Sequence, residues 1–142
     1  MILIGSDHAG FRLKKEIVAH LRRRRKSVFD LGTYSEEPVD YPDIAKKVSQ
    51  KVKSEKAKGI LICGSGTGMC MAANRIKGIR AAVAYDLYSA KMARQDNDAN
   101  IVCLRGRKFS RQKAKRIVDI FLATKFSNAS RHKRRIARLD KL

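Results

Sequence analysis

The stretch GILICGSGTG at Gly59–Gly68 constrains the fold more than any other part of the chain. An apolar run, Ile60–Ile62, leads to Cys63, and a loop of small residues follows at once. The residues from Met69 onward are typical of the first turns of a helix. A buried strand that ends in a glycine turn and feeds a helix presents outward-pointing amides and the positive end of the helix dipole. The stretch therefore predicts an anion-binding loop with a thiol at its entrance, where the same field favours the thiolate.

Strand-like and helix-like runs alternate along the whole chain, which predicts a parallel sheet with helices on both faces. We expect strands at Met1–Gly5, Ser27–Leu31, Gly59–Cys63, Ile79–Ala84 and Ile101–Leu104. Apolar residues at helical spacing predict helices near residues 10–25, 42–52, 69–73, 87–94, 111–124 and 130–142. The last helix has few apolar residues, so we expect it to pack on a partner subunit. A length of 142 residues predicts one domain, spanning residues 1–142.

The composition indicates a globular chain, because 44% of the residues are hydrophobic and no apolar run reaches the ~20 residues that span a bilayer. The first residues already resemble a strand, so we expect no signal peptide. Three cysteines without a CxxC pair indicate reduced thiols rather than a disulfide framework. Neither zinc-ligand spacing nor an HExxH motif occurs. We therefore expect a cytoplasmic protein without a structural metal.

The net charge of +20 is unevenly distributed, since residues 105–142 hold 14 Lys and Arg against Asp119 and Asp140. A second basic cluster lies at Arg22–Lys26. Such charge can bind nucleic acid by neutralising phosphates. However, aromatic residues make up only 6% of the chain, and no zinc-finger, RRM or KH signature is present. We interpret the excess as a solvated basic surface, with nucleic-acid binding as the alternative.

Polar clusters follow several of the expected strands. In open α/β sheets, ligands bind in the crevice beyond the carboxyl ends of the strands. We expect Asp7–His8, Cys63–Gly68, Asp96–Asn97 and Gly106–Arg107 to lie on this rim. Four clusters on one rim predict a single binding site.

The glycine loop matches none of the three common phosphate-loop chemistries. A Walker A motif ends in Gly-Lys-Ser/Thr, but here Met69 follows Gly68. The same Met69 stands where the dinucleotide fingerprint needs its last small residue and where a cysteine phosphatase needs an arginine. Asp86 lies about where a ribose-binding acid falls, which leaves a nucleotide site as a weaker alternative.

Each candidate side chain also has a purely structural interpretation. Cys63 could be a small buried hydrophobe, but its place beside the loop amides favours a catalytic thiol. Asp7 could simply cap the following helix, but the adjacent His8 favours a functional pair. Arg131 and Arg135 are four residues apart and share a helix face, as a phosphate clamp requires.

Together these residues resemble the ribose-5-phosphate isomerase B family, which includes the galactose-6-phosphate isomerase subunits. The resemblance runs essentially from end to end. Its landmarks are SDHAGFRLK at Ser6–Lys14, DLGTYSEEPVDYPD at Asp30–Asp43, GILICGSGTGMCMAANRIKGIRAA at Gly59–Ala82, RQDNDANIVCLRGR at Arg94–Arg107 and RHKRRI at Arg131–Ile136.

The resemblance implies a five-stranded Rossmann-like α/β/α sandwich, a homodimer or a tetramer of paired dimers, sites between subunits, and no metal or organic cofactor. It implies an aldose–ketose isomerase that interconverts ribose 5-phosphate and ribulose 5-phosphate through an enediolate. The alternatives are an isomerase of allose or galactose 6-phosphate and a non-catalytic phosphosugar-binding protein.

The family's site residues carry over by motif. Cys63 takes the position of the base that moves a proton between C2 and C1, and Met69 stands where another branch has a glutamate. Ser65 lies at the reacting oxygens, and Asp7 and Tyr41 contact the sugar. The remaining positions are the amides of Gly64, Gly66, Thr67 and Gly68 with Asn97 at the enediolate, and His8, Arg107, Arg131 and Arg135 at the phosphate, some of these arginines coming from a neighbouring subunit.

The sequence departs from the family's pattern at Asp96, where most members have a histidine that opens the furanose ring. An ordinary aspartate, with a pKa of ~3.9, is a poor acid at neutral pH. Asp96 therefore has a raised pKa, or Asp7 and His8 open the ring, or the substrate differs.

Overall fold

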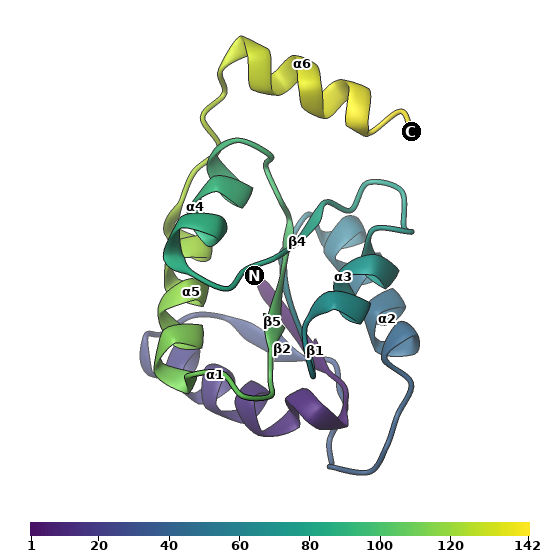
Figure 1. Ribbon diagram of the computed structural model, residues 1–142, viewed down its shortest axis with the longest axis vertical. Coiled ribbons are helices and arrows are strands. Elements are labelled where there is room, and N and C mark those ends of the chain that lie inside the picture. The colour runs from purple at the N-terminus through teal and green to yellow at the C-terminus, as the bar shows by residue number, and fades with distance from the viewer.

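A fully parallel sheet forms the middle layer of the computed structural model, which describes residues 1–142 (Figure 1). Its strands run in the spatial order β2-β1-β3-β5-β4. Their bounds are Ile2–Ser6 for β1, Val28–Asp30 for β2, Lys58–Cys63 for β3, Ala81–Val83 for β4 and Ile101–Arg105 for β5. The α/β/α sandwich with five parallel strands is thus confirmed.

Helices cover both faces of the sheet (Figure 1). One face carries α1, α4 and α5, and the other carries α2 and α3. The bounds are Phe11–Arg23 for α1, Tyr41–Glu55 for α2, Thr67–Ala73 for α3, Leu87–Gln95 for α4 and Arg111–Ala123 for α5, with a short 3-10 helix, η1, at His8–Gly10. None of the helices combines the length and the apolar character that crossing a membrane takes.

The alternation of side chains along each strand divides the core in two. Ile4, Ile62 and Leu104 pack on the face of α1 and α5, whereas Leu61 and Cys103 pack on the face of α2 and α3. Successive residues of a strand point to opposite faces, and a sheet covered on both sides therefore needs continuous apolar runs. This requirement explains the uninterrupted apolar strands that the sequence shows.

The sheet register brings the functional segments to one edge. Ser6 at the end of β1 is paired with Ile62, and Cys63 at the end of β3 is paired with Arg105 at the end of β5. The loops that follow these three central strands therefore leave the sheet side by side.

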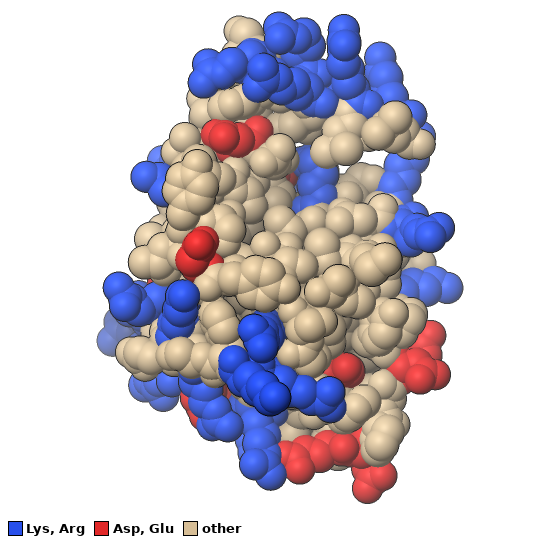
Figure 2. Space-filling model, viewed as in Figure 1, with Lys and Arg blue, Asp and Glu red and all other residues tan.

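The last helix, α6, spans Ser130–Leu139 and stands apart from the sandwich at the end opposite the strand arrowheads (Figure 1). His132 is its only buried residue. Its C-terminal end is attached by Asp140, whose carboxylate pairs with Arg80 at 3.0 Å. Lys and Arg side chains gather over this helix (Figure 2). The predicted tail helix is confirmed, and its packing on a partner stays a prediction.

Candidate active site

A cavity of about 560 Å³ opens at the carboxyl edge of the sheet, where β1, β3 and β5 end. Seven of the residues that the sequence points to line it, together with two that it does not. The lining residues are Asp7, Tyr41, Cys63, Gly64, Ser65, Gly68, Tyr85, Arg105 and Arg107.

Cys63 is the last residue of β3 and is only 5% exposed. The backbone amide of Gly66 donates a hydrogen bond to Sγ at 3.2 Å. Gly66 has a φ of +82°, in the left-handed region that favours glycine. A Cβ there would lie 3.1 Å from the carbonyl group of Leu104. The turn that aims an amide at the sulfur therefore depends on glycine at this position.

The next turn of the loop is closed by Ser65, whose hydroxyl accepts a hydrogen bond from the amide of Thr67 at 3.2 Å. Tyr41, the first residue of α2, packs its ring directly on the backbone of Gly68. A Cβ on Gly68 would lie 2.8 Å from that ring. The Tyr41 ring thus forms a wall of the cavity at Gly68.

Two guanidinium groups give the cavity a positive potential. Arg107 lies against Gly64, since a Cβ on that glycine would lie 3.2 Å from Nη1. Arg105 is paired in register with Cys63, so the alternation along the strands places both side chains on the same face of the sheet. Neither arginine has an acidic partner within 4.0 Å, and Asp7 is the only carboxylate among the lining residues. Such a site suits an anionic ligand.

Asp7 and His8 both take part in structural hydrogen bonds. The Asp7 carboxylate caps η1 by accepting from the amide of Gly10 at 3.1 Å, and Asp7 also borders the cavity. Nδ1 of His8 accepts a hydrogen bond from the amide of Val39 at 3.2 Å. The capping interpretation of Asp7 is therefore correct, and it is compatible with a place in the site.

Tyr85 and Arg105 are the lining residues that sequence reasoning missed. The Tyr85 hydroxyl donates to the carbonyl oxygen of Ser65 at 3.3 Å, so it supports the glycine loop from the segment that follows β4. Both residues sit at the carboxyl ends of strands, which is the signal that could have identified them. By contrast, Asp86 forms a capping box with Ser89 at the start of α4, which explains this acid without a nucleotide.

The other two thiols lie outside the cavity. Cys70 is half-buried on α3 and donates to the carbonyl oxygen of Ala81 at 3.4 Å. A hydrogen bond from the Cys103 thiol lowers the pKa of Cys70 from 9.0 to about 7, with smaller contributions from Val83 and Asn74 and an opposing effect of burial. The same hydrogen bond and burial raise the pKa of Cys103 well above 9.0. Cys63 is therefore the only thiol that faces the cavity.

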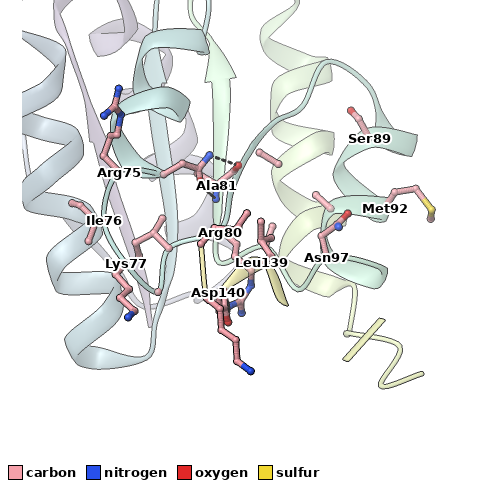
Figure 3. Close-up of a pocket in the computed structure, with 18 residues that line it drawn as sticks. Arg75, Ile76, Lys77, Arg80, Ala81, Ser89, Met92, Asn97, Leu139 and Asp140 are labelled. Carbon is pink, nitrogen blue, oxygen red and sulfur yellow. Dashed lines mark hydrogen bonds and ion pairs between the residues drawn. The ribbon is translucent and has the colours of Figure 1, made fainter. Parts of the chain in front are cut away.

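The expectation that Asp96 and Asn97 share the rim with Cys63 is wrong within one chain. These residues follow α4, which runs antiparallel to the strands and returns the chain to the amino edge before β5 begins. Asn97 lines a different cavity, of about 740 Å³, beside Arg80 and the end of α6 (Figure 3). A polar segment that follows a helix and not a strand lies at the opposite edge of a parallel sheet.

Asp96 instead contacts α6. Its Oδ1 lies 3.7 Å from Nε2 of His132, and Nδ1 of the same imidazole lies 2.7 Å from the hydroxyl of Ser127. Arg131 and Arg135 belong to the same helix, so they lie at this end of the molecule as well. The sequence-derived site residues thus form two groups, one at each edge of the sheet.

Comparison with known proteins gives consistent relatives over almost the whole chain. The family described as Ribose/Galactose Isomerase matches residues 2–139. The ribose-5-phosphate isomerase B of Escherichia coli is 46% identical over 136 residues, which cover 95% of this chain and 91% of that protein.

Solved structures agree with this result. A ribose 5-phosphate isomerase from Thermotoga maritima superimposes with a TM-score of 0.96 at 50% identity, covering 99% of this chain and 97% of that one. The ribose-5-phosphate isomerase B of Mycoplasma genitalium with bound ribulose-5-phosphate gives a TM-score of 0.93 at 44% identity, covering 99% and 93%.

Proposed function

The chain belongs to the ribose/galactose isomerase family, and from this premise we propose that it interconverts ribose 5-phosphate and ribulose 5-phosphate with Cys63 as the base. The observation that carries the proposal is the Cys63 sulfur, held by the Gly66 amide, facing a cavity that also contains two unpaired guanidinium groups. That arrangement combines a nucleophilic proton acceptor with recognition of an anion.

The reaction needs a base and preorganised donors, because a sugar carbon is a weak acid and its enediolate carries charge on oxygen. Cys63 takes the proton from C2 of the aldose and returns it to C1, while the hydroxyl proton passes from the oxygen on C2 to the oxygen on C1. The amides of Gly66 and Thr67 already donate to Cys63 and Ser65, so the other amides of residues 64–68 are the preorganised donors that we assign to those oxygens. Removing one such donor typically costs about 10²–10³ in rate.

The remaining contacts orient the sugar. Asp7 and Tyr41 border the cavity beside Cys63 and suit hydroxyl groups. Arg107 lies over the glycine loop and offers a cationic partner to a phosphate, and His8, which follows the lining residue Asp7 in the chain, is the second partner that we assign to it. Fixing the phosphate brings C1 and C2 to one sulfur, which converts binding energy into orientation.

A second copy of the chain supplies the group at the other edge. Asn97, Arg131 and Arg135 lie at the amino edge, away from Cys63 of the same chain, and α6 buries only His132 against its own body. A twofold dimer is self-complementary, so α6 of each subunit reaches the carboxyl edge of the other and completes both sites. We expect this dimer, or a pair of dimers, in a cytoplasmic setting.

Ring opening is assigned to Asp96 of that second copy. Its contact with His132 gives the carboxylate an imidazole partner, and histidine side chains exchange protons readily near neutral pH. The pair can therefore move the proton between the ring oxygen and the C1 hydroxyl.

The test is a panel of aldose phosphates assayed for ketose formation. We expect turnover of ribose 5-phosphate well above that of allose 6-phosphate and galactose 6-phosphate. Faster turnover of a hexose phosphate would mean that this sugar, and not ribose 5-phosphate, is the substrate. Binding without any ketose formation would contradict the isomerase proposal.

A further inference from the structure

Lys14, on α1, is a charged side chain with no exposed surface. Its Nζ donates to Oδ1 of Asp30 at 2.6 Å and also to the carbonyl oxygen of Thr33. The rings of Phe11 and Tyr34 lie 5.6 and 5.1 Å from Nζ, within the range of cation–π attraction. The ammonium is therefore enclosed by partners from α1, the end of β2 and the segment that follows it.

These partners close a turn at Asp30–Tyr34. The Asp30 carboxylate accepts from the amide of Gly32 at 2.9 Å, and the Tyr34 hydroxyl donates to the carbonyl oxygen of Asp30 at 3.1 Å. Lys14 bonds to two points of this turn, the Asp30 carboxylate and the backbone carbonyl of Thr33. Its position thus fixes the direction in which the chain leaves β2.

The turn is joined to the end of β1, directly before the active-site cavity. The amide of Ser6 donates to the carbonyl of Gly32 at 2.7 Å, and the amide of Thr33 donates back to the carbonyl of Ser6 at 2.8 Å. The next residue after Ser6 is Asp7, which lines the cavity. A shift of the turn would therefore be transmitted to β1 at the residue where the site begins.

At its other end, the same segment reaches two further site residues. The amide of Val39 donates to Nδ1 of His8, and Tyr41 opens α2 with its ring on Gly68. Residues 31–40 thus run from the Lys14 contacts to His8, the neighbour of the lining residue Asp7, and to Tyr41, which lines the cavity itself. Between its two ends the segment also carries Glu36, whose exposed carboxylate pairs with Arg12 of α1, whereas the Lys14 contacts at the first end are buried.

We propose that Lys14 is a positioning residue of the active site, which holds the Asp30–Tyr34 turn and so sets the path of residues 31–40 and the placement of His8 and Tyr41. The inference rests on the proposed isomerase function for its consequence in catalysis, whereas the anchoring itself does not depend on it.

Stability alone does not account for this arrangement. Removing a charge from water is costly, and apolar side chains of similar volume often replace a buried ion pair without loss of stability. Burial lowers the pKa of Lys14, while Asp30 opposes this effect. What an apolar side chain cannot reproduce is two directional bonds to separate points of one turn.

The experiment compares Lys14→Met with Lys15→Met. Lys15 is the next residue on α1, is exposed, and also has its Nζ 5.5 Å from the Phe11 ring, but it makes no bond to the turn. Hydrogen exchange of amides 31–40 and steady-state kinetics with ribose 5-phosphate are measured on both variants. We expect faster exchange in residues 31–40 of Lys14→Met only, and a KM raised about tenfold or more with a smaller change in kcat.

A double-mutant cycle with His8→Ala separates positioning from a general loss of stability. If Lys14 acts through His8, the effects of the two substitutions on KM are not additive, whereas independent effects add. Additive effects, or exchange in residues 31–40 equal to that of Lys15→Met, would overturn the proposal. If Lys14→Met does not fold, Asp30→Asn removes the charge of the partner and is judged by the same measurements.

The two hypotheses fail in different ways. A wild-type chain without isomerase activity contradicts the proposed function, and the exchange measurement still decides whether Lys14 anchors the segment. If the wild-type enzyme is active and KM is unchanged in both variants, the role of Lys14 is contradicted and the proposed function is not.

Discussion

The amide of Gly66 donates to the sulfur of Cys63 across 3.2 Å, so the loop that is expected to bind the reacting oxygens also orients the thiol. One short turn does both, because glycine is the residue type that adopts the φ of position 66 so close to the Leu104 carbonyl. The geometry of the base and of its oxyanion donors is therefore set by the backbone.

Replacing the Cys63 thiol should remove the chemical step. We expect Cys63→Ala to lower kcat for ribose 5-phosphate by about 10²–10⁴, the usual contribution of a positioned base. Alanine fits the space of the cysteine, so circular dichroism and the elution volume on gel filtration should match those of the wild type. Substantial turnover by the purified variant would show that another group is the base.

Active sites shared between subunits predict complementation. We expect Arg131→Ala and Arg135→Ala to raise KM for phosphorylated sugar, while Arg134→Ala, an exposed residue of the same helix, leaves it unchanged. At a substrate concentration well below the raised KM, mixing Cys63→Ala with Arg135→Ala subunits should restore about a quarter of wild-type activity, because half of the dimers are mixed and each of these holds one intact site.

The complementation has two controls. Each variant is carried alone through the same dissociation and reassociation, and neither should recover. No recovery in the mixture, despite mixed dimers detected by native mass spectrometry, would place both residues in the site of one chain.

The sequence was sufficient for the fold because apolar runs and helical stripes alternate without ambiguity. It also located the edge formed by Asp7, the Cys63 loop and Arg107, since each follows a strand. Asp96 and Asn97 were misplaced because they follow α4 and precede β5, and a helix in this fold reverses the direction of the chain. Connectivity, more than residue type, decides which edge a polar cluster joins.

Arg105 and Lys14 show what pattern reasoning does not reach. In the sequence, Arg105 lies next to Gly106 and resembles the start of a turn. Only the pairing of β5 with β3, which sets Arg105 beside Cys63, places it in the cavity. A lysine in an amphipathic helix is normally expected on its solvent side, whereas Lys14 has no exposed surface and bonds to the Asp30–Tyr34 turn. Both depend on contacts between segments that are distant in the sequence.

Asp96 is predicted to act in ring opening but not in proton transfer between carbons. Ribulose 5-phosphate has no free hydroxyl at C5 and stays open-chain, so its C1 proton can exchange with solvent without this residue. We expect Asp96→Asn to lower kcat for ribose 5-phosphate at least about tenfold. Exchange of the ribulose 5-phosphate C1 proton in D₂O, followed by NMR, should persist.

Asp96→His provides the matched variant. An imidazole, with an ordinary pKa of ~6.5, exchanges protons at neutral pH more readily than a carboxyl group of ~3.9, so turnover of ribose 5-phosphate should equal or exceed that of the wild type. If Asp96→Asn loses solvent exchange and turnover together, Asp96 acts in the enediolate step instead.

The hydrogen bond from Cys103 predicts an unusual pH dependence for Cys70. Its pKa of about 7 means that the thiolate, and with it the rate of alkylation, rises through pH 7 and not through the ordinary 9.0. In a Cys63→Ala background, peptide 59–75 contains Cys70 as its single thiol, so iodoacetamide labelling can be followed by mass spectrometry. Cys103→Ala removes the donor and should move the midpoint upward, toward 9.0. Cys103→Ser keeps a donor and should move it less, whereas equal midpoints in all three chains would mean that Cys103 does not stabilise the Cys70 thiolate.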